Sequence, residues 1–472
     1  MRNEKEIWNI VDALHEPFVV MSDTIWGMPE LNFEEYRSSE EHARRLEAEG
    51  FTLHRGIAGI PTALMGEAGS GGPVIAFLGE YDALPGLSQE AGSVEKKTCA
   101  ETGDNGHGCG HNLLGTGALL AAAAVKKYLE QHNLPGRVRY YGCPAEENGC
   151  GKTFMVRAGV FDDVDVALSW HPAPFAAVDA MSSLANQFID FSFSGRASHA
   201  ATSPHLGRSA LDAIELMNVG VNYMREHMPQ AARIHYAMLD GGGVAPNVVQ
   251  AFAKVRYLIR APDLQMLKEL VARVRKIADG AALMSETQVS ASVISGQSNL
   301  VDNMPLAKIL QANFDRLGPP DFDEADREFA RQIGRTFTKE DVATTYHRYG
   351  MTPLDPAPPL CDSIVPFECR NFVSGTASTD LGDVSWVVPT IYARGAVFAV
   401  GTPGHSWQLV SQGKLPAAHK GMMHVSKALA GTAIDVFENP ARLEAIRADH
   451  RARVGDGYEC PIPADTPVPL PA

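Results

Sequence analysis

The sequence lacks long apolar runs and is short of positive charge, and each absence excludes a class of protein. No stretch of about 18 or more apolar residues occurs, so no transmembrane helix is predicted. The 472-residue chain has 41 lysines and arginines against 56 acidic residues, a formal charge of −15. Nucleic acid and anionic membranes need basic surfaces, so neither is expected as a partner. The first residues, MRNEKEIWNIVDALHEPF, carry charges where a secretion signal needs an apolar segment.

Cysteine is also scarce. Seven cysteines, an odd number, are spread thinly over the chain. This usage favours free thiols in a reducing compartment over a disulfide framework, so we expect a cytoplasmic protein. Hydrophobic residues make up 45% of the chain and charged residues 21%, which argues against extended disorder. The length predicts two or three domains with a substantial core.

Three apolar runs each lead directly into a polar cluster. The runs and their clusters are Val74–Leu78 with Glu80 and Asp82, Val138–Cys143 with Glu146 and Glu147, and Val164–Trp170 with His171. Residues 112–132, rich in alanine and leucine, predict a helix between the first two runs that Asn112 could cap. Strands that alternate with helices indicate an α/β domain with a largely parallel sheet. Ligands bind beyond the carboxyl ends of such strands, so the three clusters are expected to share one site.

A different pattern begins near Asn186. The predicted elements are a strand at 187–195, a helix at 206–228, strands at 233–242 and 247–262, a helix at 263–285 and a strand at 287–295. This βαββαβ order is that of a ferredoxin-like sandwich. We therefore expect residues 1–185 and 299–472 to form one α/β domain, interrupted by an inserted domain at 186–298. The proline-rich residues 460–472 are expected to form an irregular surface extension.

The segment GHGCGHN, residues 106–112, is a candidate metal site. Cys109 and His111 are two residues apart, so in an extended segment both side chains point to the same side. The glycines allow the backbone to bend tightly around an ion. Zinc-like ions accept thiolate sulfur at about 2.3 Å and imidazole nitrogen at about 2.0 Å. The alternative is a glycine-rich loop with a buried thiol and a hydrogen-bonded histidine, and the segment alone does not separate the two.

The other candidate ligands also have structural alternatives. Of the adjacent Glu146 and Glu147, one could ligate a metal while the other acts on a water. An isolated pair of glutamates is more often a solvated acidic turn. Here the pair follows a buried strand, which places it at the sheet edge where ligands are expected to bind. His171 lies beside two polar clusters, which favours a ligand over a packed histidine. His405, in the loop GTPGHSWQ, is uninformative by itself.

Several other histidines, cysteines and tryptophans lie near these segments. We expect five of them to be structural: His107, Cys143, Cys150, His419 and His424. Three tryptophans could stack on an aromatic substrate or simply pack in the core: Trp26, Trp170 and Trp407. No arginine is assigned to a substrate carboxylate.

Six motifs occur in a fixed order along nearly the whole chain. They are GHGCGHN, PAEENGCGK, WHP, SGRASHAATSP, GGGVAPNVV and GTPGHSWQ. Together they resemble the aminoacylase and carboxypeptidase-G type metallopeptidase superfamily, and within it the amidohydrolase branch whose metal motif contains Cys-Gly-His. Any one motif is weak, but six in order are specific. The chain departs from many relatives at two positions. It has Asn112 where they have Asp, a departure that this branch shares, and it has Gln250 where they have Pro. Both departures leave the substrate pocket less defined.

The resemblance implies a zinc-peptidase-like catalytic domain with an inserted lid or dimerisation domain. It also implies that one or two divalent ions, manganese or zinc, would be held by five ligands: Cys109, His111, Glu147, His171 and His405. Glu146 would be the general base, and Asp82 would steady a ligand imidazole. His199 in the inserted domain would reach the active site of a partner chain and stabilise the oxyanion, and Asn247 would lie near the substrate. Without the resemblance, both would be read as turn residues.

The expected activity is metal-dependent hydrolysis of the amide bond in N-acyl amino acids, with p-aminobenzoyl-glutamate or a similar aromatic acyl-amino acid as substrate. Dipeptides and acyl-aspartate or related conjugates are alternatives of the same class. Two alternatives belong to other classes. One is a weakly active or non-catalytic subunit, against which the intact ligand set argues. The other is a structural zinc protein, against which the dispersed ligands and the spare carboxylate argue. We expect a homodimer through the inserted domain, with a hetero-oligomer of related subunits still open.

Overall fold

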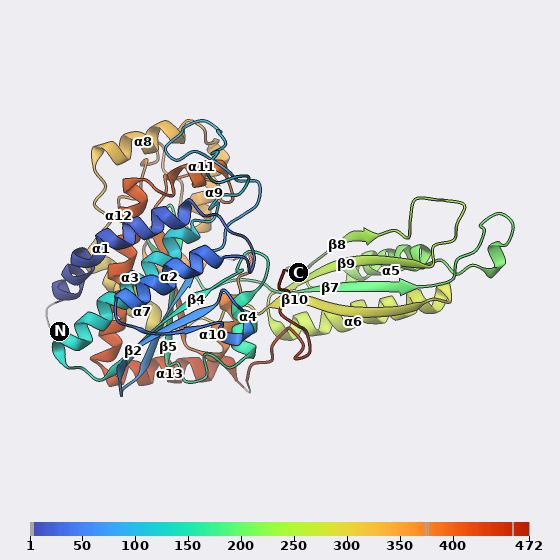
Figure 1. The fold of residues 1–472 in the computed structure, drawn as a ribbon, viewed down its shortest axis with the longest axis horizontal. Coiled ribbons are helices and arrows are strands. Elements are labelled where there is room, and N and C mark those ends of the chain that lie inside the picture. The colour runs from blue at the N-terminus through green and yellow to red at the C-terminus, as the bar shows by residue number, and fades with distance from the viewer. Residues whose placement is uncertain (1–3, 373–374, 376, 456, 472) are drawn as a thin grey trace.

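The computed structural model describes residues 4–372, 375, 377–455 and 457–471. Figure 1 shows a rounded body and a long arm that extends from one side of it. No helix of the described residues is long and apolar enough to cross a membrane. All seven cysteines are free thiols, as the sequence predicts.

The body is built on a seven-stranded mixed sheet. Its strands are β1 (Thr52–Arg55), β2 (Leu64–Ser70), β3 (Val74–Glu80), β4 (Gly136–Cys143), β5 (Val166–Ala173), β6 (Ala177–Val178) and β11 (Thr390–Ala396). They lie in the order β1-β2-β4-β3-β5-β11-β6. The four inner strands, β4, β3, β5 and β11, run parallel, whereas β1, β2 and β6 pair antiparallel at the edges. The α/β class is confirmed, and the parallel part of the sheet is its centre.

The inner strands are apolar because both of their faces are covered. Every residue of β3 is buried, and β4 and β5 are buried along almost their whole length. Strands that are buried on both faces read as continuous apolar runs. Because the four strands are parallel, their carboxyl ends meet at one edge, where Glu80 ends β3 and Cys143 ends β4. One detail of the prediction was wrong: His171 lies within β5 and does not follow it.

Helices cover the sheet and complete the core. Those of the body are α1 (Glu4–Trp26), α2 (Tyr36–Ala48), α3 (His111–His132), α4 (Gly151–Arg157), α7 (Met304–Leu317), α8 (Glu324–Gly334), α9 (Lys339–Arg348), α10 (Leu381–Val387), α11 (Trp407–Gln412), α12 (Pro416–Phe437) and α13 (Pro440–Val454). Helix α3 packs on β3, β4 and β5, α12 packs on β5 and β11, and α1 lies against both helices. These three helices and the inner strands form the main hydrophobic core.

The start of α3 differs from the prediction. The helix begins at His111, and its N-cap is Gly110, which has a φ of 79° and makes no side-chain capping bond. Asn112 is therefore not the cap. Its buried amide instead donates hydrogen bonds to Ser22 Oγ (3.1 Å) and to the carbonyl oxygen of Gly413 (3.0 Å). The left-handed conformation favours glycine, and it turns the chain so that Cys109 and His111 face the same edge of the sheet.

The arm has the predicted βαββαβ order. Its elements are β7 (Ala185–Ser194), α5 (Ala210–Met224), β8 (Arg233–Asp240), β9 (Phe252–Ala261), α6 (Leu264–Ser285) and β10 (Gln288–Gln297). The strands form a separate antiparallel sheet in the order β10-β7-β9-β8, and the two helices pack on it around a second core. The predicted start of α6 is also confirmed, because Asp263 is the N-cap and accepts a hydrogen bond from Met266 N. The boundaries of the inserted domain stay a prediction.

The proline-rich end of the chain forms no helix or strand among the described residues. It nevertheless packs against both parts of the molecule. Ile462 is buried in the main core, the carbonyl oxygen of Pro461 accepts from Gln187 at 2.5 Å, and that of Pro463 accepts from Arg157 at 2.6 Å. Because Gln187 belongs to β7 of the arm and Arg157 to α4 of the body, this segment bridges the root of the arm.

Candidate metal centre and active-site cavity

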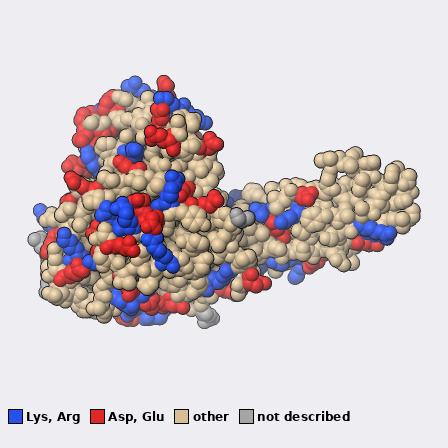
Figure 2. Space-filling view, viewed as in Figure 1, with Lys and Arg blue, Asp and Glu red and all other residues tan. Residues whose placement is uncertain are grey.

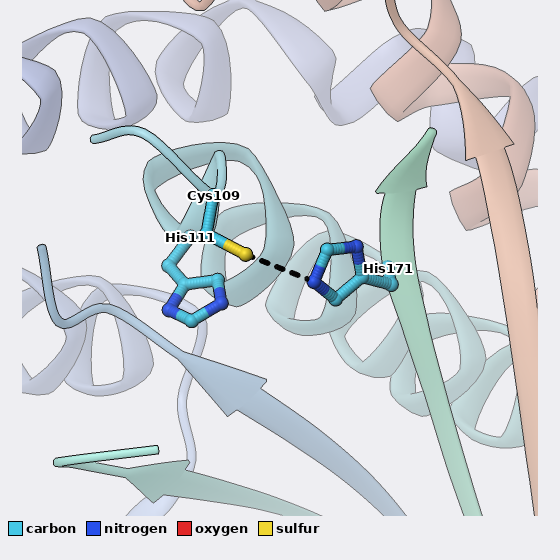
Figure 3. A group of neighbouring side chains, drawn as sticks. All are labelled: Cys109, His111 and His171. Carbon is cyan, nitrogen blue, oxygen red and sulfur yellow. Dashed lines mark hydrogen bonds between the residues drawn. The ribbon is translucent and has the colours of Figure 1, made fainter. Parts of the chain in front are cut away.

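Three of the predicted ligands meet at the carboxyl edge of the parallel strands. Donor atoms of Cys109, His111 and His171 all lie within 4.8 Å of one another. Figure 3 shows the sulfur of Cys109 directed at the ring of His171, and the distance from Sγ to Nε2 is 3.2 Å. Cys109 and His111 come from the turn into α3, whereas His171 comes from β5. The fold therefore brings together side chains that are 62 residues apart.

Two further predicted ligands complete a second, overlapping group. Donor atoms of Cys109, Glu147 and His405 also lie within 4.8 Å of one another. The Nε2 atom of His405 is 3.5 Å from Glu147 Oε1, and its side chain is 56% exposed. Its backbone N donates to Gly108 O at 3.1 Å, which ties the loop of His405 to the turn that carries Cys109. Cys109 is common to both groups, so the five side chains form one cluster.

Asp82 forms hydrogen bonds with a residue of each group. Its Oδ1 accepts from Nδ1 of His111 at 2.8 Å, and its Oδ2 accepts from the backbone N of Glu147 at 2.9 Å. Burial alone would raise the pKa of Asp82, but the charge of His111 and these hydrogen bonds hold it below its usual range. Asp82 is thus an ionised acceptor that orients two of the cluster's side chains.

The donor set fits a divalent cation. His111 and His171 engage Nδ1 with Asp82 and with Pro172 O (2.8 Å), which leaves both Nε2 atoms toward the cluster. The buried Nε2 of His111 and Oε1 of Glu147 have no hydrogen-bond partner among the described residues. Burial would lower the pKa of His111, yet Cys109 and Asp82 raise it well above its usual value. The site therefore favours positive charge, and sulfur, nitrogen and oxygen donors together suit several transition metals.

Glu146 lies beside this cluster. Donor atoms of Glu146, His111 and Glu80 lie within 4.8 Å of one another. Burial, followed by the charges of Glu80 and Glu147, raises the pKa of Glu146 well above its usual value. A carboxyl group with a raised pKa can both accept and return a proton near neutral pH. This is the property that a general base and acid needs.

A buried ionic network near Glu146 was not predicted. The ammonium of Lys152 is fully buried, is paired with Asp380, and lies 2.7 Å from Glu80 Oε1. The backbone N of Lys152 also donates to Asp380 at 2.8 Å. Burial would lower the pKa of Lys152, but the two carboxylates raise it well above its usual value. The charged lysine thus offsets part of the negative charge around the cluster. Nothing local in the sequence pairs Lys152 with a residue 228 positions away.

The cluster opens into a cavity of about 430 Å³. Five predicted residues line it: Cys109, Glu146, Glu147, His171 and His405. His111 and Asp82 are fully buried behind them. The rest of the lining includes unpredicted aromatic and charged residues, among them Tyr349, Tyr392, Phe398, Asp179, Arg348 and Arg394. The cavity is large enough for a small organic substrate.

His199 and Asn247 do not line this cavity. Both belong to the arm, in neighbouring loops that are joined by a hydrogen bond from Ala200 N to Asn247 O at 3.0 Å. His199 follows β7, whose carboxyl end lies toward the far end of the arm in Figure 1. Within one chain, the structure therefore does not bring these two residues to the metal cluster.

The three histidines expected to be structural have structural contacts. The ring nitrogens of His107, His419 and His424 bond to Ile25 O, to Asp23 and to Gly318 O, respectively. None of the three tryptophans lines the cavity. Trp170 is buried and donates to Leu114 O at 2.9 Å, and Trp26 donates to Val410 O at 3.1 Å. The packing alternative holds for these two, and the aromatic lining is supplied by Tyr349, Tyr392 and Phe398 instead.

Comparison with known proteins gives consistent matches. The sequence model described as Peptidase family M20/M25/M40 matches residues 76–330. The chain is 46% identical to one of the subunits of p-aminobenzoyl-glutamate hydrolase from Escherichia coli K12, over 99% of this chain and 100% of that protein. It is 30% identical to the Xaa-Arg dipeptidase of Mus musculus, over 94% and 91% of the two chains. A solved dinuclear metal-binding peptidase of family M20 from Bacillus subtilis has a TM-score of 0.57 and 16% identity, with 90% and 99% covered.

Proposed function

Because the chain belongs to peptidase family M20/M25/M40 and is a hydrolase of amide bonds, we propose that it cleaves N-acyl amino acids, with p-aminobenzoyl-glutamate or a similar aromatic acyl-amino acid as substrate. The convergence of Cys109, His111, Glu147, His171 and His405 beside Glu146 is the observation that carries this proposal. The near full-length similarity to a p-aminobenzoyl-glutamate hydrolase chain supports the substrate. The aromatic residues of the cavity suit an aromatic acyl group.

The cluster is proposed to hold one or two divalent ions, manganese or zinc. Two overlapping donor groups that share Cys109 support this number. When bound, such an ion lowers the pKa of a coordinated water and polarises a carbonyl oxygen. Burial raises the pKa of the Cys109 thiol, so the thiolate needs a nearby positive charge. Cys109 is therefore assigned as a ligand and has no nucleophilic role.

Glu146 is proposed to move the proton. It accepts the proton of the attacking water and later gives it to the nitrogen of the leaving amine, so no proton is gained or lost over the cycle. Asp82 keeps His111 and Glu147 in place through both steps. The charged Lys152 below offsets the negative charge that the carboxylates of Glu80 and Asp380 would otherwise add beside Glu146.

The test is the variant Glu146→Gln, assayed with p-aminobenzoyl-glutamate. We expect turnover to fall at least about a hundredfold, because general base catalysis typically contributes that much or more. The metal content, measured by elemental analysis, should stay at the wild-type level. Chelation should abolish wild-type activity, and added manganese or zinc should restore it. Retained turnover in the variant would remove Glu146 from this role, and bound metal with no wild-type turnover would favour a non-catalytic subunit.

A dimer through the arm is also proposed, and with it a role for His199 in trans. The edge strand β8 has no partner strand on its outer side among the described residues, and its side chains Tyr236, Met238 and Leu239 are each more than 40% exposed. Figure 2 shows few charges on this face of the arm compared with the body. Such an apolar edge favours pairing with a second chain. That chain would be a second copy or a related chain, since the bacterial relative is named as one subunit of its enzyme.

The ring of His199 is oriented for such a role. The backbone N atoms of Ala201 and Thr202 donate to its Nδ1 at 3.2 and 3.3 Å. Because Nδ1 accepts these bonds, it is Nε2 that can donate a proton to a developing oxyanion. Asn247 is proposed to contact the substrate from the adjacent loop. We also propose a cytoplasmic location, which the seven free thiols support.

A further inference from the structure

A second cavity of about 450 Å³ adjoins the active-site cavity. The two share one wall, which includes Asp179, Arg348, Tyr349 and Arg394. None of the metal-cluster residues lines the second cavity, whereas Arg370 and His347 do. The residues of this wall can therefore contact a ligand in either cavity.

The charges around the second cavity do not balance. Asp179 is its one lining carboxylate among the described residues. One oxygen of Asp179 pairs with Nε of Arg394 at 2.5 Å, and the other accepts from the backbone N of Met181 at 2.9 Å. Asp179 therefore neutralises Arg394, and its other oxygen already accepts a backbone N–H. Arg370 has its own partner, Asp302, at 2.8 Å.

Arg348 has no carboxylate partner among the described residues. It is the last residue of α9, its side chain is exposed, and no hydrogen bond or ion pair joins it to a described residue. It nonetheless lines both cavities. Arg394 also has donors to spare, because only its Nε bonds to Asp179. The shared wall therefore presents two guanidinium groups and the charge of one carboxylate.

We propose that Arg348 determines specificity by binding the side-chain carboxylate of an acidic amino acid in the second cavity. The inference rests on the proposed function, and it names the class of amino acid: glutamyl or aspartyl conjugates. A guanidinium binds a carboxylate through two parallel N–H donors, and an amide in the same place accepts fewer such bonds and carries no charge. The α-carboxylate, which is next to the scissile amide, stays in the first cavity, where Arg394 has free donors.

The first test compares p-aminobenzoyl-glutamate with p-aminobenzoyl-glutamine. For Arg348→Gln we expect kcat/KM for the glutamate substrate to fall about 10- to 100-fold, mainly through KM, as for loss of a charged hydrogen bond. The value for the glutamine substrate should change less than about threefold, because its amide does not need the charge. Arg348→Lys should recover part of the preference. Arg335→Gln, in an exposed arginine that lines neither cavity, is the matched control and should behave as wild type.

The second test uses binding and does not depend on turnover. The full-length, metal-loaded protein is titrated calorimetrically with L-glutamate and with L-glutamine. Wild type should bind glutamate about tenfold or more tightly, as expected for a charge-assisted contact, and Arg348→Gln should remove the difference. Equal binding of the two amino acids by wild type, or an equal loss of both substrates in the variant, overturns this inference and leaves the proposed function standing. Absence of all turnover with the glutamate preference intact overturns the proposed function instead.

Discussion

At the scale of single residues, the cluster depends on side chains that do not line the cavity. Asp82 is the clearest, because its two oxygens hold the ring of His111 and the backbone of Glu147 at once. Both partners donate, so each position needs an oxygen. Outer partners of this kind fix the tautomer and direction of ligand side chains.

Asp82→Asn replaces one of these oxygens by an NH₂ group. Either His111 or Glu147 then faces a donor, so we expect metal affinity to fall about 10- to 100-fold, as for other outer partners of metal ligands. Competition with a fluorescent chelator measures the change. Asp104→Asn, an exposed residue of the preceding loop, should leave the affinity unchanged. If Asp82→Asn bound metal as tightly as wild type, Asp82 would have no part in holding the ligands.

At the scale of elements, the position of α3 decides where Cys109 and His111 lie. The helix approaches the sheet closely because it has glycines on the contacting side. A Cβ atom on Gly115 would lie 2.5 Å from Glu80 O and 2.6 Å from Nε2 of His42, and one on Gly117 would lie 2.9 Å from the Trp170 ring. Backbone atoms of β3 cannot move aside as a flexible side chain can. The short distance between α3 and β3 therefore depends on the absence of side chains at these glycines.

Gly115→Ala should push α3 away from the strand. We expect a loss of about 1–3 kcal/mol in the free energy of unfolding, the usual range for overpacking a dense core. Urea denaturation followed by circular dichroism measures it. The matched control is Gly280→Ala in α6, where a Cβ meets nothing within 4 Å, and alanine there should stabilise by about 0.5–1 kcal/mol. Equal stabilities of the two variants would contradict this account of the packing.

At the scale of the whole molecule, one chain carries two separate parts of the proposed active site. The cluster lies in the body, whereas His199 and Asn247 lie in loops of the arm and do not line the cavity. The tail bridges the root of the arm to the body through Gln187 and Arg157. The proposed role of His199 therefore requires a second chain, because its loop does not line the cavity of its own chain.

Mixing two inactive variants tests this arrangement. Chains with His199→Ala and chains with Glu146→Gln should each be nearly inactive, but a mixed dimer contains one intact site. After unfolding and refolding together, an equal mixture should recover about a quarter of wild-type turnover, since half of the dimers are mixed and each has one working site. Each variant refolded alone is the control. Mixed dimers, seen by mass-resolved chromatography, that show no recovered activity would contradict the role of His199 in trans, and full activity of the His199→Ala chain alone would remove it from catalysis.

Local patterns determined what could be predicted from the sequence. Continuous apolar runs indicated β3, β4 and β5, because a strand covered on both faces must be apolar throughout. Segments with strand-like and helix-like patterns, in the order βαββαβ, indicated the arm. The polar residues that end these strands were placed at one edge of the sheet, since the ends of parallel strands coincide, and the motifs added His405 from far along the chain.

Only the tertiary structure decided the remaining contacts. Lys152 pairs with Asp380, and Arg348 and Arg394 line the same cavity, because folding brings distant segments together. No periodicity in the chain encodes such meetings. The cap of α3 was misjudged for a related reason: a left-handed Gly110 starts the helix, and Asn112 is used for a contact with Gly413. The sequence by itself determined the elements and the kinds of ligand, since these follow from local chemistry. The fold decided which charges remain unpaired, because that depends on every segment that meets at the cavity.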